Sequence, residues 1–214
     1  MSDKSNKYGY VGVDIPAQSF GSNKGVFNPA EINDLVANNQ WTSFGQLELI
    51  QTQVADGTST YLDFTNIKQD IYNVHFVTFS NIQWGTADTF KARVSNDNGA
   101  TFIASGYYSG QLTGGSTGSF SEATRTNYSE FDRILQNQAN IPHNGYCYFY
   151  NLGDSTKYNT MTQHTLNWAG GVFQFKYGSQ LSNSLTSINA LRFFTSTYNI
   201  LSGATISLYG IRYS

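Results

Sequence analysis

The feature that most constrains this chain is a two-residue period in its apolar side chains, clearest in residues 188–214. Its apolar members are Leu191, Phe193, Ile206 and Leu208, and the residues that alternate with them are Arg192, Phe194, Ser207 and Tyr209. Because successive side chains of a strand point to opposite faces, the pattern predicts two strands, each with one buried side. We expect a hairpin whose connector, residues 195–203, ends at Gly203, where glycine accepts a positive φ. We expect the second arm to lie inside a sheet.

Similar short segments follow one another from Gln46 onward and are separated by turn residues. We expect further strands at residues 47–54, 60–64, 74–79, 90–94, 101–104, 146–152, 160–166 and 172–177. Residues 105–121 are rich in Gly, Ser and Thr and predict a long loop, whereas residues 122–135 fit either a strand or a helical turn. About eight to ten strands without crossover helices predict an all-β, antiparallel β-sandwich that is jelly-roll-like.

The N-terminal part of the chain has a different pattern. Residues 1–45 are expected to form an extended arm with one short helix, and residues 46–214 to form the sandwich domain. The helix is predicted to begin at Asn28 and Pro29, because asparagine caps a helix, proline fits its first position, and Glu31 can reach back to the cap. We expect the arm to be held either by a partner subunit or by its own domain, and both alternatives stay open.

The composition excludes several classes of protein. Only 12% of the residues are charged and the net charge is −2, which argues against binding to nucleic acid or to an anionic membrane surface. The single cysteine, Cys147, excludes an intrachain disulfide. Residues 1–7 are polar and no apolar run follows, so we expect synthesis in a cytoplasm without a secretory leader and without membrane insertion.

Catalytic and metal-binding motifs are not found in the sequence. His75, His143 and His164 are far apart and lack metal-ligand spacing, and His75 is expected to be a sheet residue. Cys147 lies in a strand that is apolar on both faces, which predicts a buried, unreactive thiol. Neither a nucleophile elbow nor a phosphate-binding loop is present. We therefore predict a protein that is not an enzyme, with no catalytic residue, metal site or cofactor.

Aromatic residues are the best candidates for a binding role. The chain contains 15 Tyr, 15 Phe and 3 Trp. Four of these residues lie close to glycines in expected loops, namely Trp84, Tyr107, Tyr108 and Trp168. Aromatic rings on loops can stack on sugar rings or anchor a subunit interface, and they can equally cover sheet edges or fill the ends of a core. All of these interpretations stay open for these four residues.

The C-terminal segment also resembles a known group of proteins. The matching positions are Ile188, Leu191, Arg192, Phe193, Ser202, Gly203, Ile206, Ser207, Leu208, Tyr209, Gly210 and Ile211, together with residues 25–31 followed by Trp41. They resemble β-sandwich structural proteins of tailed bacteriophages, of the tail-fibre, head-fibre and decoration types, including those of marine and cyanobacterial phages. The resemblance covers about a fifth of the chain.

This resemblance implies a non-enzymatic structural protein on the surface of a virion, assembled in the host cytoplasm. It would be a fibre or receptor-binding subunit or a capsid decoration subunit, and a homo-oligomer with a trimer favoured. Its partners would be other virion proteins and a host-surface glycan. The attachment segment would include Tyr8, Tyr10, Phe20 and Phe27. The alternative is a carbohydrate-binding module or a glycan depolymerase, and a depolymerase needs two carboxylates about 5–10 Å apart in an aromatic groove.

Overall fold

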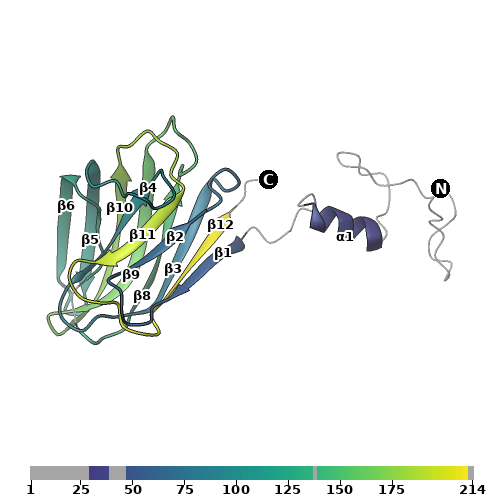
Figure 1. The fold of residues 1–214 in the computed structure, drawn as a ribbon. Coiled ribbons are helices and arrows are strands. Elements are labelled where there is room, and N and C mark those ends of the chain that lie inside the picture. The colour runs from purple at the N-terminus through teal and green to yellow at the C-terminus, as the bar shows by residue number, and fades with distance from the viewer. Residues whose placement is uncertain (1–28, 39–46, 137–138, 212–214) are drawn as a thin grey trace, which may run out of the picture. The chain divides into compact units, whose positions relative to one another are not determined.

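The computed structural model describes residues 29–38, 47–136 and 139–211 (Figure 1). The chain divides into two units, Met1–Gly45 and Gln46–Ser214, and each is described by itself. In the first unit, helix α1 (Pro29–Ala37) confirms the predicted short helix. The backbone and side-chain amides of Asn38 both donate to the Asp34 carbonyl, at 3.0 and 2.8 Å, and so satisfy an acceptor at the helix end. The predicted cap and attachment residues lie outside the described residues: Asn28, Tyr8, Tyr10, Phe20 and Phe27.

The second unit is built from antiparallel strands, which confirms the predicted all-β sandwich. The strands are β1 (Leu47–Val54), β2 (Tyr61–Thr65), β3 (Val74–Ile82), β4 (Thr89–Ser95), β5 (Tyr107–Gly115), β6 (Phe120–Tyr128), β7 (Phe131–Gln136), β8 (His143–Tyr150), β9 (Asn159–Ala169), β10 (Val172–Ser182), β11 (Ala190–Thr195) and β12 (Thr205–Ile211). Eight of them form one sheet in the order β1-β12-β3-β8-β9-β10-β5-β6, and four form a second in the order β2-β11-β4-β7. Figure 1 shows the smaller sheet lying over the larger one.

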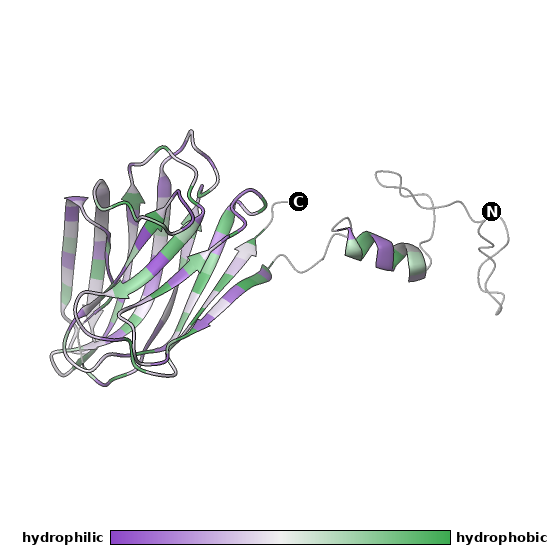
Figure 2. Ribbon diagram, in the orientation of Figure 1, coloured by the Kyte–Doolittle hydropathy of each residue, from purple (hydrophilic) through white to green (hydrophobic). Residues whose placement is uncertain are grey.

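The hydrophobic core lies between the two sheets. Hydrophobic and hydrophilic residues alternate along most strands (Figure 2). Phe193 of β11 occupies the centre of the core, with its ring 5.3 Å from the ring of Phe79 and 5.9 Å from that of Phe64. Leu191 and Leu208 are also fully buried. Burial of each such side chain contributes about 1.5–3 kcal/mol, so these apolar positions supply most of the driving force for folding.

The C-terminal segment does not form the predicted hairpin. β11 pairs with β2 and β4 in the smaller sheet, whereas β12 pairs with β1 and β3 in the larger sheet. The predicted faces are nevertheless correct, because Leu191, Phe193, Ile206 and Leu208 are all fully buried. β12 also lies inside its sheet, as predicted. The connector crosses the gap of about 10 Å between stacked sheets, and it turns at Gly203, whose φ is +87°.

Two loop and strand predictions are wrong. Residues 105–121 form most of a hairpin between β5 and β6 and not a long loop. Residues 122–135, for which a strand and a helical turn were both open, belong to the strands β6 and β7. Glycine suits this hairpin because an aromatic ring of the neighbouring strand β10 occupies the space that a side chain would need. A Cβ on Gly114 would lie 2.3 Å from the ring of Phe175. The return strand predicted at residues 101–104 is absent from the described structure. Instead Asp97 accepts hydrogen bonds from Ser95 Oγ and from the Thr101 amide and hydroxyl, which stabilises a loop.

Candidate functional site

The four aromatic residues that the sequence singles out separate into two pairs. Trp84 is fully buried, with its ring stacked 6.3 Å from Phe90, and Tyr107 is 1% exposed. The Tyr107 hydroxyl donates to the Ile103 carbonyl at 3.0 Å and accepts from the Val94 amide at 3.2 Å, while burial raises its pKa. Trp84 and Tyr107 are therefore core residues, and neither is available to contact a glycan or a second subunit.

Tyr108 and Trp168 lie in the strands β5 and β9 and not in loops. Both point to the side of the eight-stranded sheet that faces away from the smaller sheet, which we call the outer face. Tyr108 is exposed and pairs in register with Leu181, and Trp168 packs 6.5 Å from the ring of Phe173. The structure thus places these two residues on one surface, near different ends of the strands.

The outer face carries many more aromatic residues than the sequence singled out. By strand alternation and register they include Phe76, Tyr146, Tyr148, Tyr150, Phe173, Phe175, Tyr177 and Tyr209. The ring of Phe76 lies 4.7 Å from Tyr148 and 5.9 Å from Tyr209, and together these three form an aromatic row across β8, β3 and β12. The alternation of residues 146–150 carries a signal for them, but a strand with apolar side chains on both faces does not indicate which face is exposed.

A shallow groove crosses the outer face at right angles to the strands. Its floor is a row of small residues in register on β6, β5, β10 and β9, namely Thr124, Gly110, Ser179 and Thr162. Two adjoining hollows, of about 680 and 440 Å³, share Gly110, Ser179 and Thr162 and lie on either side of this row. We call the two hollows together the cross-strand groove.

Large side chains form the walls of the cross-strand groove. Glu122, Leu112 and Tyr177 line one side, and Tyr108 and Leu181 line the other. Tyr177 and Leu181 are four residues apart on β10, so the wall positions are about 13 Å apart along the strand. In register, the floor continues from Thr162 onto Tyr148 and so meets the aromatic row. The groove and the row therefore form one continuous surface from β6 to β12.

Few charges lie on this surface. Among the described residues of the eight strands, alternation places one carboxylate, Glu122, and one imidazole, His164, on the outer face. Arg125 also lines the groove, but its guanidinium is held by Asp132 at 2.9 Å. Hydroxyl groups of Thr, Ser and Tyr supply most of the polar contacts that a ligand can make here.

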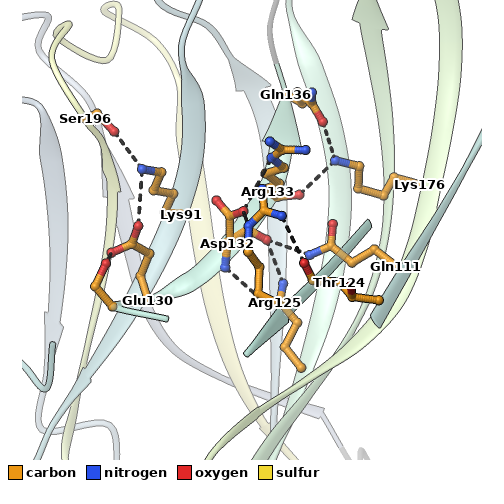
Figure 3. Close-up of polar contacts among 12 residues, drawn as sticks. Lys91, Gln111, Thr124, Arg125, Glu130, Asp132, Arg133, Gln136, Lys176 and Ser196 are labelled. Carbon is orange, nitrogen blue, oxygen red and sulfur yellow. Dashed lines mark hydrogen bonds and ion pairs between the residues drawn. The ribbon is translucent and has the colours of Figure 1, made fainter. Parts of the chain in front are cut away.

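A buried polar layer fixes the groove strands from behind (Figure 3). Gln111 and Gln180 both donate to the backbone carbonyl of Asp132 in β7, at 2.7 and 2.9 Å, and Gln180 accepts from the Asp132 amide. Lys176 is buried and donates to the Arg133 carbonyl and to Gln136 Oε1, at 3.2 and 2.7 Å. β5, β10 and β7 are thus tied together, so the floor of the groove is preorganised.

The histidines and the cysteine do not gather into a site. His75 is buried on β3, with Nε2 2.8 Å from the Ile67 carbonyl, and burial lowers its pKa. Cys147 is buried on β8, and burial raises the pKa of its thiol well above the usual value. Within the described ranges, no three His, Cys, Asp or Glu side chains lie close enough together to hold a metal ion.

Comparison with known proteins gives no match, whether to family models, to curated proteins or to solved structures. A search of the helical part of the described chain finds no segment long and apolar enough to cross a membrane.

Proposed function

We propose that this protein is a non-enzymatic glycan-binding β-sandwich, and that the outer face of its eight-stranded sheet is the binding surface. The observation that carries the proposal is the combination of a shallow groove, exposed aromatic rings and very few charges on one face. Aromatic rings offer flat apolar surfaces on which sugar rings stack, and nearby hydroxyl groups pair with sugar hydroxyls. Because the floor of the groove is held from behind, little conformational entropy is lost on binding.

Among the described residues, the lining of the groove has one carboxylate, which favours binding of a glycan over its hydrolysis. Glycosidases of the common types need two carboxyl groups that face each other across the scissile bond. Glu122 is the carboxylate among the described residues that line the groove. Two other acidic residues of the sandwich are held in ion pairs: Asp63 binds Arg192 through both oxygens at 2.7 Å, and Glu130 binds Arg93 at 3.0 Å.

We further propose that the glycan is a host-surface receptor and that the protein acts on the surface of a tailed-phage particle, attached through residues 1–45. This part of the proposal depends on the resemblance of the C-terminal segment. Because β11 and β12 lie in different sheets, these two strands do not form a hairpin, and the resemblance is one of sequence pattern alone. A glycan-binding face favours the fibre or receptor-binding role over the capsid decoration role.

Affinity electrophoresis in gels that contain soluble polysaccharides tests the binding face. Tyr177, which is 49% exposed on the groove wall, is replaced in Tyr177→Ala, and the control is Tyr158→Ala, a tyrosine that is 47% exposed in the loop before β9. Loss of one stacking contact of about 0.5–1.5 kcal/mol weakens binding about two- to tenfold. We expect Tyr177→Ala to migrate faster in the ligand gel, whereas Tyr158→Ala migrates like wild type.

Two results would contradict the proposal. One is equal retardation of Tyr177→Ala and wild type by every polysaccharide that retards the wild type. The other is wild-type self-association, measured by sedimentation velocity, that Tyr177→Ala abolishes. That second outcome would make the outer face a subunit interface.

A further inference from the structure

We infer that the ligand of this face is a linear, uncharged polysaccharide that lies across the strands, from β6 to the aromatic row on β8, β3 and β12. The inference rests on the proposed function. It narrows the ligand from glycans in general to an unbranched, uncharged chain that runs across the strands. Three features of the outer face carry it: the row of small residues, the strand spacing, and the scarcity of charge.

The row of small residues sets the direction of the chain. Thr124, Gly110, Ser179 and Thr162 lie side by side across four strands, and larger side chains stand on both sides of the row. A ligand placed along a strand would have to pass over Tyr177 or Leu181, which flank Ser179 on β10. A ligand placed across the strands meets only small residues until it reaches Tyr148. An unbranched chain fits this path because side branches would run into the walls.

The strand spacing sets the length of the chain. Neighbouring strands lie about 4.8 Å apart, which is close to the repeat of one pyranose unit in an extended polysaccharide. The path from β6 to β12 crosses β5, β10, β9, β8 and β3, which makes six spacings between seven strands. The path is therefore about 29 Å long and matches about six or seven sugar units. Affinity should rise with chain length up to that number of units and then level off.

The charges on the path exclude anionic glycans. Carboxylate and sulfate groups of glycans are recognised through Arg and Lys side chains, which offer charge-assisted hydrogen bonds. Among the described residues that line the groove the one Arg is Arg125, and it is already paired with Asp132. Glu122, on β6, stands on the groove wall. An anionic chain would meet Glu122 without a compensating cation, whereas a neutral chain would gain a hydrogen-bond acceptor there.

Gly110 offers a direct test because it lies in the middle of the floor. A Cβ added to Gly110 meets no atom within 4 Å, and the φ angle of Gly110 is not positive. A phenylalanine at this position can therefore be accommodated by the fold while it fills the groove. Gly85 is the matched control, because its added Cβ also meets no atom within 4 Å and it lies in the exposed loop before β4, away from the groove.

The experiment is isothermal titration of the full chain with cello-, laminari- and xylo-oligosaccharides of two to eight units, and with oligogalacturonides as the anionic probe. We expect at least one neutral series to bind, with affinity that rises to about six or seven units and then stays constant. We expect Gly110→Phe to bind the longest member of that series at least tenfold more weakly, and Gly85→Phe to bind like wild type. Equal melting temperatures of the three proteins establish that the folds are intact.

The outcomes separate the two proposals. Binding of a disaccharide as tightly as of a heptasaccharide, preference for oligogalacturonides, or full binding by Gly110→Phe would overturn the inference while leaving a glycan-binding protein. Absence of binding to every series by a protein that a polysaccharide gel still retards would overturn the inference alone. Absence of both binding and retardation would overturn the proposed function together with the inference.

Discussion

Buried Lys176 should make the stability of the sandwich depend on pH in an unusual direction. Its side chain is 1% exposed in the polar layer behind the groove. Burial, together with the nearby positive charge of Arg133, lowers its pKa from 10.5 to about 8, and Asp132 offsets only part of this. Because the pKa in the folded state lies below that in the unfolded state, the charged lysine destabilises the fold below about pH 8. That penalty disappears as the pH rises through 8 towards 10.5.

The size of the effect follows from the two pKa values. A shift from 10.5 to about 8 corresponds to a penalty of about 3 kcal/mol at pH 7. By pH 9.5 the folded lysine is neutral and the unfolded one still charged, so about 2 kcal/mol of this penalty has been relieved. We therefore expect the free energy of unfolding of the wild type to rise by about 2 kcal/mol relative to Lys176→Met between pH 7 and pH 9.5.

Urea denaturation at several pH values from 7 to 9.5 measures this difference. The absolute stability of Lys176→Met is less informative, because the variant leaves Gln136 Oε1 without its Lys176 donor, at a cost of about 1–3 kcal/mol. It also removes one of the two donors to the Arg133 carbonyl, and the Gln163 side-chain amide remains. Lys157→Met is the control, since Lys157 is exposed and Asp154 raises its pKa, so its removal cannot reproduce the effect. Parallel pH profiles for the wild type and Lys176→Met would refute the reasoning.

Two further predictions concern the connection between the sheets and the last strand. Leu208→Ala should lower the free energy of unfolding by about 2–5 kcal/mol, because Leu208 is fully buried. Ser207→Ala, on the outer face, should lower it by less than about 1 kcal/mol, because it removes only the 2.9 Å hydrogen bond to Thr52. Thermal denaturation compares the two, and a larger loss for Ser207→Ala would reverse the assigned faces. Gly203→Val should cost about 1–3 kcal/mol, because a β-branched residue resists the φ of +87°. Urea denaturation checks this, and wild-type stability of Gly203→Val would show that the turn tolerates any residue.

The sequence predicts which face of a strand is buried more reliably than which strand it pairs with. Alternation placed Leu191 and Leu208 in the core correctly, because side-chain direction is a local property of the strand. Pairing depends on contacts between distant segments: β12 lies between β1 and β3, and β11 lies between β2 and β4. The nine residues between β11 and β12 allow a hairpin or a crossing between sheets, and nothing local decides between them.

The candidate site shows the same limit. Tyr107 and Tyr108 are neighbours with almost the same local sequence, yet Tyr107 is buried in the core and Tyr108 is exposed on the outer face. Their roles differ because β5 pairs with β10 in one particular register, and that register is a property of the whole sheet. The cross-strand groove could not be predicted for the same reason, since Thr124, Gly110, Ser179 and Thr162 are brought together only by pairing.

The position of β12 has a consequence for the way the protein is made. β1 joins the eight-stranded sheet through β12, which begins 151 residues after β1 ends. At a synthesis rate of about 5–20 residues per second, β1 waits roughly 8–30 s for its partner to leave the ribosome. During this time Leu47, Leu49 and Val54, which remain exposed even in the folded sheet, belong to an unpaired strand. Crowded expression should therefore cause aggregation through β1, and a lower concentration of nascent chains with chaperones present should raise the yield of soluble protein.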